Sequence, residues 1–173
     1  MKEKGYTQVY TGNGKGKTTA ALGLIMRAAG AGFKIYLGQF IKSLEYHEVR
    51  ILRDLPGVTV ELYGEEGCIV GRRPDESDIR CVREGLARAN EILRSGEYDL
   101  VVLDEIFIAS HFGLVTDEEL LALMDTRPEN TELVMTGRYA PEAVLDHADL
   151  VTEMKEIRHY YEKGVLAREG IER

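Results

Sequence analysis

Two short groups of residues have the types and the spacing that phosphate chemistry requires. The first is a loop with glycine at every second position, interspersed with lysines and followed by two threonines. Its residues are Gly12, Asn13, Gly14, Lys15, Gly16, Lys17, Thr18 and Thr19. Because glycine lets backbone N–H groups approach an anion, the pattern predicts a loop that holds the phosphates of a nucleotide.

The Gly-Lys-Thr ending of this loop suggests roles for two side chains. Lys17 is expected to face solvent and reach the terminal phosphates, and the Thr18 hydroxyl is expected to ligate Mg²⁺. A strand is predicted before the loop and a helix after it, and the helix would add free amides and its positive dipole end. The Walker pattern expects a glycine where Thr11 stands. A glycine-rich hairpin or linker with chance lysines is the alternative interpretation.

The second group is a pair of acids, Asp104 and Glu105, directly after the apolar run 100–103. A carboxylate in this position can hold Mg²⁺ directly or through water, as in a Walker B motif. Strands often end in acids without a catalytic role, so the pair is informative mainly together with the loop. Together they predict a metal site made by Thr18, Asp104 and Glu105, with Lys17, Thr18 and Glu105 as catalytic residues.

Three arginines could complement the charge of a polyphosphate. Arg27 lies on the helix predicted after the loop, and Arg127 lies further along the chain. Arg138 follows the predicted strand 131–136 after one glycine, which makes it the better candidate for a residue beside the loop. Each arginine alone is more often a surface charge. We expect Arg27 and Arg138 to bind the nucleotide.

Other catalytic arrangements are not evident. The histidines have no metal-ligand spacing, and we expect each of them to be exposed or structurally paired: His47, His111, His147 and His159. No Ser/His/Asp or Cys/His arrangement can be argued from spacing, and no separate general base stands out. This matters for any reaction other than hydrolysis.

Strands and helices alternate along the chain. Strands are predicted at 7–10, 34–40, 58–63, 100–103, 131–136 and 150–154, and helices at 17–29, 43–54, 79–93, 116–125 and 141–147. This alternation predicts an α/β fold with a mostly parallel sheet of about six strands and helices on both faces. In such sheets ligands bind beyond the carboxyl ends of the strands. The loop, the acid pair and Arg138 all fall at these ends.

Length and composition indicate one domain over residues 1–173. The formal net charge of −8 opposes non-specific nucleic-acid binding, which needs a positive field. The two cysteines form no metal pattern, and neither a signal peptide nor an apolar run of about 18 residues is present. We therefore expect a cytoplasmic protein with reduced thiols and no nucleic-acid or membrane partner.

The chain resembles the corrinoid adenosyltransferases of the cobalamin pathway, those of the P-loop type, over nearly its whole length. The matching segments are 9–21, 39–42, 100–105, 127–128, 136–138, 148–154 and 170–172. The loop with its two Gly-Lys pairs and the block Asp-Leu-Val-Thr-Glu-Met at 149–154 are specific in combination. Thr11 is then the family's own variant of the loop.

This resemblance implies a RecA-like P-loop fold, usually in a homodimer, and a reaction. The 5′-deoxyadenosyl group of ATP would pass to the cobalt of a reduced corrinoid, and tripolyphosphate would leave. The nucleotide would lie reversed in the loop, with Mg²⁺ near Thr18 and Glu105 and a flavin-type reductase as a further partner. A Co(I) nucleophile carries no proton, so positioning and charge stabilisation by the loop amides, Lys15, Lys17 and Arg27 would suffice.

The sequence departs from the family in two places. Relatives often carry Gly-Phe-Thr-Trp in the loop after the third strand, whereas this chain has Gly-Cys-Ile-Val at 67–70 and no tryptophan. Some relatives also carry an N-terminal extension over the site, and here the first predicted strand starts near residue 7. We expect the loop 64–74 still to close over the corrinoid through Cys68, Ile69 and Val70; a surface excursion far from the site is the alternative.

Two other functions fit the loop and the acid pair. The chain could be a P-loop kinase or ATPase that acts at the γ-phosphate. It could also be a nucleotide-binding regulatory module without turnover. Tripolyphosphate, ADP or no product at all would distinguish the three hypotheses.

Overall fold

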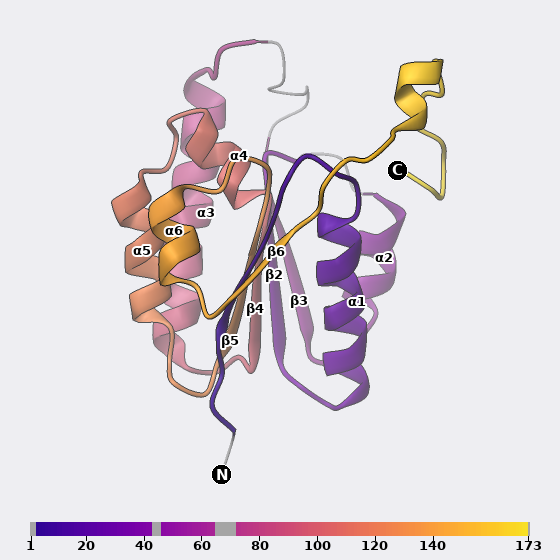
Figure 1. The fold of residues 1–173 in the computed structure, drawn as a ribbon. Helices are drawn as coiled ribbons and strands as arrows, with labels where there is room; N and C mark the ends of the chain where they lie inside the picture. The colour runs from indigo at the N-terminus through magenta and orange to yellow at the C-terminus, as the bar shows by residue number, and fades with distance from the viewer. Residues whose placement is uncertain (1–2, 43–45, 65–71, 173) are drawn as a thin grey trace.

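The fold is known from a computed structural model that describes residues 3–42, 46–64 and 72–172. Over these residues six parallel strands form one sheet in the order β3-β2-β4-β5-β1-β6 (Figure 1). The strands are β1 (Thr7–Thr11), β2 (Ile35–Phe40), β3 (Val58–Tyr63), β4 (Leu100–Asp104), β5 (Glu132–Thr136) and β6 (Leu150–Glu153). The predicted parallel sheet of about six strands is confirmed.

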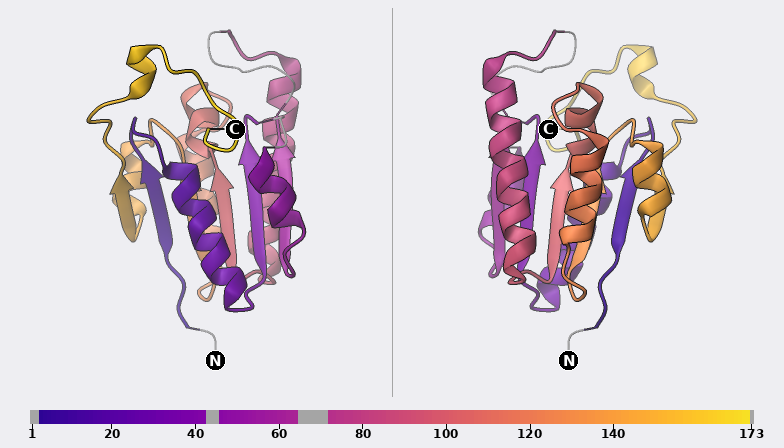
Figure 2. Two further views of the ribbon diagram at one scale, coloured as in Figure 1. Left: turned by 90° about the vertical axis from the view of Figure 1, so that its right-hand side faces the viewer. Right: turned by 90° about the vertical axis from the view of Figure 1, so that its left-hand side faces the viewer.

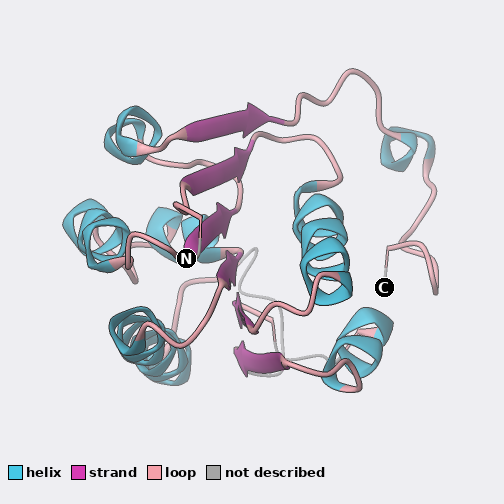
Figure 3. Cartoon of the chain, turned by 90° about the horizontal axis from the view of Figure 1, so that it is seen from below, coloured by secondary structure: helices cyan, strands magenta, loops and turns pink. Residues whose placement is uncertain are grey.

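Helices cover both faces of the sheet, as predicted, because each parallel connection must cross over it. On one face lie α1 (Lys17–Gly30) and α2 (His47–Arg53); on the other lie α3 (Glu76–Ser95), α5 (Asp117–Thr126) and α6 (Glu142–His147) (Figures 2 and 3). The predicted helix over 43–54 is confirmed only from His47, since residues 43–45 lie outside the described ranges. None of the helices in the described ranges is long and apolar enough to cross a membrane.

The central strand β4 shows why the chain needs an uninterrupted apolar run. Val101 and Leu103 pack into the core under α3 and α5, whereas Leu100 and Val102 pack into the core under α1 and α2. Successive side chains of a strand point to opposite faces, so a strand covered on both sides must be apolar at every position. This double burial fixes the sheet between two helical layers.

Two helix starts follow the capping signals of the sequence. Asp75 accepts hydrogen bonds from the N–H groups of Ser77 and Asp78, and the Asp78 side chain accepts one from the N–H of Asp75. Thr116 and Glu119 make the same reciprocal pair at the start of α5. Such boxes satisfy two orphan donors of the first turn, so α3 begins three residues before the predicted start.

Two short helices were not predicted. Helix α4 (Ile106–His111) begins directly after the acid pair, and the 3₁₀ helix η1 (Tyr160–Lys163) lies in the tail after β6, where no element was predicted. After β6 this tail crosses from the α6 side of the molecule to the α1–α2 side (Figure 1). The end of the chain therefore approaches the glycine-rich loop.

Candidate active site

The candidate site lies at the carboxyl edge of the sheet, where four adjacent strands end. In spatial order β2, β4, β5 and β1 present Gln39, Asp104, Thr136 and Thr11 at or near their last positions. Strand β5 therefore separates the loop strand β1 from the acid strand β4. Because all six strands run parallel, residues far apart in the sequence meet at this edge.

The glycine-rich loop leaves its helix open to an anion. Gly16 occupies the N-cap of α1 with a φ of 118°, and no side chain of the described residues caps the first turn. The free N–H groups of that turn carry the positive end of the helix dipole. Asn13 and Thr19 are exposed and Thr18 is partly exposed, so these side chains lie at the surface of the loop.

The glycines of the loop are also required by a neighbouring backbone. A Cβ on Gly12 would stand 2.5 Å from the carbonyl oxygen of Met154, and one on Gly14 would stand 2.6 Å from it. The N–H of Gly14 donates to the same oxygen at 2.6 Å. Sequence reasoning assigned the glycines to anion binding alone, yet the segment after β6 demands them too.

Lys17 is buried, with only 6% of its surface exposed. Its ammonium donates to the carbonyl oxygens of Gly12 at 2.8 Å and Gly14 at 2.7 Å. Burial lowers its pKa, an effect opposed by the charge of Glu105. The prediction that Lys17 faces solvent is wrong, because the carbonyls of the loop fold around the ammonium and remove it from water.

Lys15 points the other way, toward the tail. Its ammonium donates to Glu172 at 2.6 Å and to the hydroxyl of Tyr160 at 3.0 Å. The hydrogen bond with Glu172 raises the pKa of Lys15. Glu172 also accepts hydrogen bonds from Arg168, so the closing Gly-Ile-Glu segment is anchored at the loop.

Asp104 is fully buried and accepts four hydrogen bonds from side chains. Thr18 and Thr136 donate to one oxygen at 2.9 and 2.7 Å, and Gln39 and Lys42 donate to the other at 3.0 and 2.8 Å. Burial pushes the pKa of Asp104 up, but the Lys42 ammonium and the hydroxyls outweigh it and hold the pKa below its ordinary value. This carboxylate therefore serves as a fixed anionic centre between the sheet and α1.

Glu105 differs from Asp104 in its backbone conformation, its hydrogen bonding and the direction of its pKa shift. Its backbone is left-handed, with φ at 59°, and its N–H donates to the hydroxyl of Thr136 at 3.0 Å. No donor in the described ranges hydrogen-bonds its carboxylate. Burial and the negative charge of Asp104 raise the pKa of Glu105. A partly buried carboxylate that accepts no hydrogen bond is suited to receive a cation.

The three candidate arginines lie in different places. Arg138 is beside the site, since its charge acts on the pKa values of both Lys17 and Glu105. Arg27 lies in the last turn of α1, ten residues after Lys17 and therefore about 15 Å along the helix. Arg127 donates to Thr7 and to backbone carbonyls at the amino edge of the sheet. The structure does not bring Arg27 to the loop, which corrects the expectation that it binds the nucleotide beside Lys17. Arg127, which the sequence offered only as a possible complement to a polyphosphate, lies away from the loop as well.

Comparison with known proteins identifies the family. The family model described as ATP:corrinoid adenosyltransferase BtuR/CobO/CobP matches residues 3–173. The chain belongs to this family. It is 35% identical to the corrinoid adenosyltransferase of Escherichia coli K12 over 170 residues, covering 98% of this chain and 86% of that protein.

Two further relatives carry related names. The corrinoid adenosyltransferase of Pseudomonas aeruginosa is 35% identical over 172 residues, covering 98% of this chain and 84% of that protein. Corrinoid adenosyltransferase CobA of Salmonella typhimurium is 33% identical over 172 residues, covering 99% of this chain and 87% of that protein. The resemblance inferred from the motifs is therefore confirmed.

Three further residues complete the acid centre of this adenosyltransferase: Gln39, Lys42 and Thr136. The sequence placed Gln39 at the carboxyl edge of the sheet, but it suggested no role for any of the three. All three lie in segments that matched the family, 39–42 and 136–138. A signal was available, because each is a polar residue at or just past the end of a buried strand. The Oε1 atom of Gln39 has no hydrogen-bond partner in the described ranges, because the Nε2 atom must face the acceptor Asp104.

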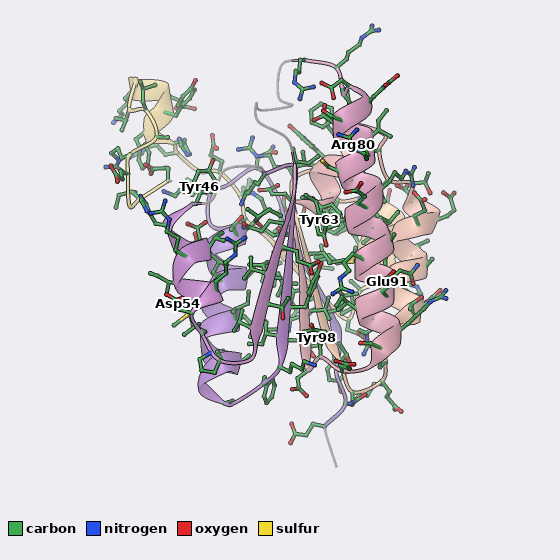
Figure 4. The ribbon with its side chains drawn as sticks, turned by 180° about the vertical axis from the view of Figure 1, so that it is seen from behind. Tyr46, Asp54, Tyr63, Arg80, Glu91 and Tyr98 are labelled. Atoms are coloured by element: carbon green, nitrogen blue, oxygen red, sulfur yellow. The ribbon has the colours of Figure 1, made fainter. Side chains whose placement is uncertain are left out.

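A second polar cluster holds the end of β3. Tyr36 and Tyr63 both donate to Glu61, and Arg88 of α3 contacts the same carboxylate. Figure 4 shows Tyr63 on the side of the sheet that faces α3. Gly85 of α3 makes this possible, since a Cβ there would stand 2.6 Å from the Tyr63 ring. The predicted corrinoid loop starts just beyond, but its Cys68, Ile69 and Val70 lie outside the described residues.

Proposed function

We propose that this chain transfers the 5′-deoxyadenosyl group of ATP to the Co(I) centre of a reduced corrinoid. The observation that carries the proposal is the full-length family match, joined to a loop and an acid pair that meet at one edge of the sheet. In the transfer the cobalt electron pair forms a bond to C5′, the C5′–O bond breaks, and tripolyphosphate takes its electron pair. No proton moves, which agrees with the lack of an evident general base.

The residues of the site would act by position and by charge. The free N–H groups at the start of α1, together with Lys17 and Arg138, would stabilise the negative charge on the departing triphosphate. Lys17 would have to exchange its two carbonyl partners for phosphate oxygens. Lys15 would bind the outer part of the phosphate chain, where it now binds Glu172.

The residues present fit a Mg²⁺ site that the substrate completes. Within the described ranges no group of three or more His, Cys, Asp or Glu could hold a metal ion. Mg²⁺ in nucleotide enzymes is commonly bound by one or two protein groups together with phosphates. Thr18 and Glu105 would be its protein ligands, with Asp104 fixing the Thr18 hydroxyl; the metal would neutralise charge on the phosphates.

We further propose a homodimer and a cytoplasmic setting, in which a reductase of flavin type supplies Co(I). The edge strand β6 supports the dimer, because Leu150 and Val151 are exposed at 43% and 45%. Unpaired strand edges with apolar side chains are usually covered by a partner. The formal net charge of −8 gives no support for a nucleic-acid partner.

The decisive assay combines ATP with chemically reduced cob(I)alamin and follows the visible spectrum and the phosphate product. We expect an adenosylated corrinoid and tripolyphosphate in equal amounts. A β,γ-imido analogue of ATP should still react, because the bond between its β and γ positions is not cut. Formation of ADP from ATP would favour a kinase or ATPase instead, and binding without turnover would favour a regulatory module.

A further inference from the structure

Three aromatic side chains that have not yet been given a role lie close together near the candidate site. The His111 ring stacks on Tyr139, with centroids 4.2 Å apart and planes inclined by 28°. Phe112 meets the His111 ring edge-on at 5.6 Å. Tyr139 remains 52% exposed despite this stack, so a large part of its ring stays open to solvent. We call His111, Phe112 and Tyr139 the aromatic shelf.

The backbone under this shelf is strained. In the described part of the chain, three residues other than glycine have a positive φ: Ile41 at 60°, Glu105 at 59° and Tyr139 at 64°. All three lie beyond the carboxyl ends of strands, after β2, β4 and β5. A bulky residue in this conformation costs free energy and is found mostly where function requires it. A glycine would fit the turn at Tyr139 more easily, which points to a use for the ring itself.

The shelf is held at a defined place next to the phosphate site. Gly137, with φ at 142°, lets the turn after β5 press against α4, since a Cβ there would stand 2.8 Å from Phe107. The stack of Tyr139 on His111 fixes the same turn to the far end of α4. Arg138, whose charge reaches Lys17 and Glu105, directly precedes Tyr139. The shelf therefore includes the residue that directly follows Arg138 in the turn after β5.

We propose that the aromatic shelf is the surface on which the corrin ring of the second substrate lies. This inference rests on the proposed function and adds a binding surface to it. In an in-line displacement the cobalt stands on the side of C5′ opposite the leaving phosphate, so the macrocycle must lie beyond the phosphate-binding charges. A broad conjugated disc with apolar faces suits an open shelf of rings, from which it displaces water.

Two other uses of the shelf make different predictions. The adenine ring could stack there, in which case ATP affinity depends on Tyr139. The stack could also serve only to fasten the turn after β5 to α4, in which case its loss lowers stability and changes no affinity. The left-handed backbone of Tyr139 separates these cases, because glycine is favoured at this φ and removes the ring without straining the chain.

The test uses Tyr139→Gly and His111→Ala, with Phe33→Ala as matched control. Phe33 is exposed to a similar extent, at 45%, but lies at the opposite edge of the sheet. Calorimetry would measure the binding of three separate probes to the full chain. They are ATP, inorganic tripolyphosphate and cobinamide, which is a corrinoid without a lower base. Thermal unfolding would be recorded for every variant.

We expect both shelf variants to bind cobinamide about ten-fold more weakly, the loss of one good ring contact. ATP and tripolyphosphate should bind as to the wild type, and the Tm of Tyr139→Gly should be unchanged or higher. Weaker ATP binding with unchanged tripolyphosphate binding would assign the shelf to adenine and overturn the proposal. A lower Tm with unchanged cobinamide binding would overturn it in favour of a structural clamp. If the wild type itself bound no corrinoid, the proposed function would fail first, and this inference with it.

Discussion

The two edges of the sheet use similar side chains in opposite ways. At the amino edge Arg127 donates to Thr7 and to the carbonyls of Gly5 and Thr131, and the Lys34 ammonium lies 2.6 Å from the Glu97 carboxylate. At the carboxyl edge the partly buried Glu105 has no hydrogen-bond donor on its carboxylate in the described ranges. The amino edge is satisfied within the chain, and the carboxyl edge is left to be completed by a ligand.

Backbone strain follows the same division. The positive-φ residues other than glycine, Ile41, Glu105 and Tyr139, all lie at the carboxyl edge of the described structure. Local rules of folding are broken where a site must be presented, and the rest of the fold has to offset the cost. Changes at the amino edge should therefore affect stability, and changes at the carboxyl edge should affect function.

The largest effect is expected for Lys17→Met. Methionine keeps the buried stem but removes the ammonium, so stabilisation of the departing triphosphate is lost. We expect kcat to fall about 10²- to 10³-fold, the usual cost of one transition-state donor. The measurement is the rate of tripolyphosphate release, taken well below the Tm because the change also removes the two hydrogen bonds of the ammonium to the loop carbonyls.

Arg127→Met is the matched control for Lys17→Met at the other edge. It removes several hydrogen bonds, so we expect the free energy of unfolding to fall by about 2–3 kcal/mol. Turnover measured well below the Tm should stay near the wild-type value. A Lys17→Met enzyme with wild-type turnover, or an Arg127→Met enzyme without turnover, would break the comparison between the edges.

Asp104→Asn should show that one carboxyl-edge acid is structural after all. The change leaves the partly buried Lys42 ammonium without its charge partner, so we expect a loss of about 3 kcal/mol in stability. The pKa of Asp104 is lowered by folding. Its contribution is therefore present above the ordinary pKa of about 4 and is lost as the pH falls through the folded value.

Urea unfolding of both proteins across the pH range tests this expectation for Asp104. The stabilities of the wild type and of Asp104→Asn should differ most near neutral pH and converge in acid. Equal stabilities at neutral pH would show that the four hydrogen bonds of Asp104 contribute little.

A smaller effect, on metal dependence, is expected for Glu105→Gln. The proposed Mg²⁺ site loses one ligand, so the Mg²⁺ concentration for half-maximal tripolyphosphate release should rise about ten-fold. Stability should not fall, since burial raises the pKa of Glu105 and its charged form opposes folding. For the same reason the contribution of Glu105 to the free energy of unfolding of the wild type rises as the pH falls through its raised pKa. The variant has no titrating group there, so its stability should not show this rise. An unchanged Mg²⁺ titration would remove Glu105 from the metal site.

The sequence was sufficient for the parts of the fold that depend on local patterns. Three such patterns each lie within a few residues of the sequence. They are the apolar run of β4, the capping pairs Asp75–Asp78 and Thr116–Glu119, and the loop before α1. The sequence alone could have excluded Arg27 from the loop, because ten helical residues put it about 15 Å along the helix from Lys17. The rise per residue of an α-helix is constant, so this distance follows from the residue numbers alone.

The remaining parts of the site depend on strand order, which local patterns do not contain. Lys42 meets Asp104 because β2 and β4 are neighbours, and Thr136 meets it because β5 lies on the other side. The stack of His111 on Tyr139 likewise joins two segments that only the fold brings together. Burial of Lys17 depends on how the loop carbonyls close around it.

The smallest effect is expected for Glu172→Gln, which tests the tail contact at the carboxyl edge. Glu172 holds the Lys15 ammonium and lowers the charge available to the phosphates, so its neutralisation should improve ATP binding. Exposed ion pairs contribute little, and we expect KM for ATP to fall only about two- to three-fold, without a change in Tm. Since salt screens such charges, the difference from the wild type should shrink when ionic strength is raised. If KM for ATP rose instead, Glu172 would be orienting Lys15 toward the nucleotide, and the tail would have to be counted as part of the site.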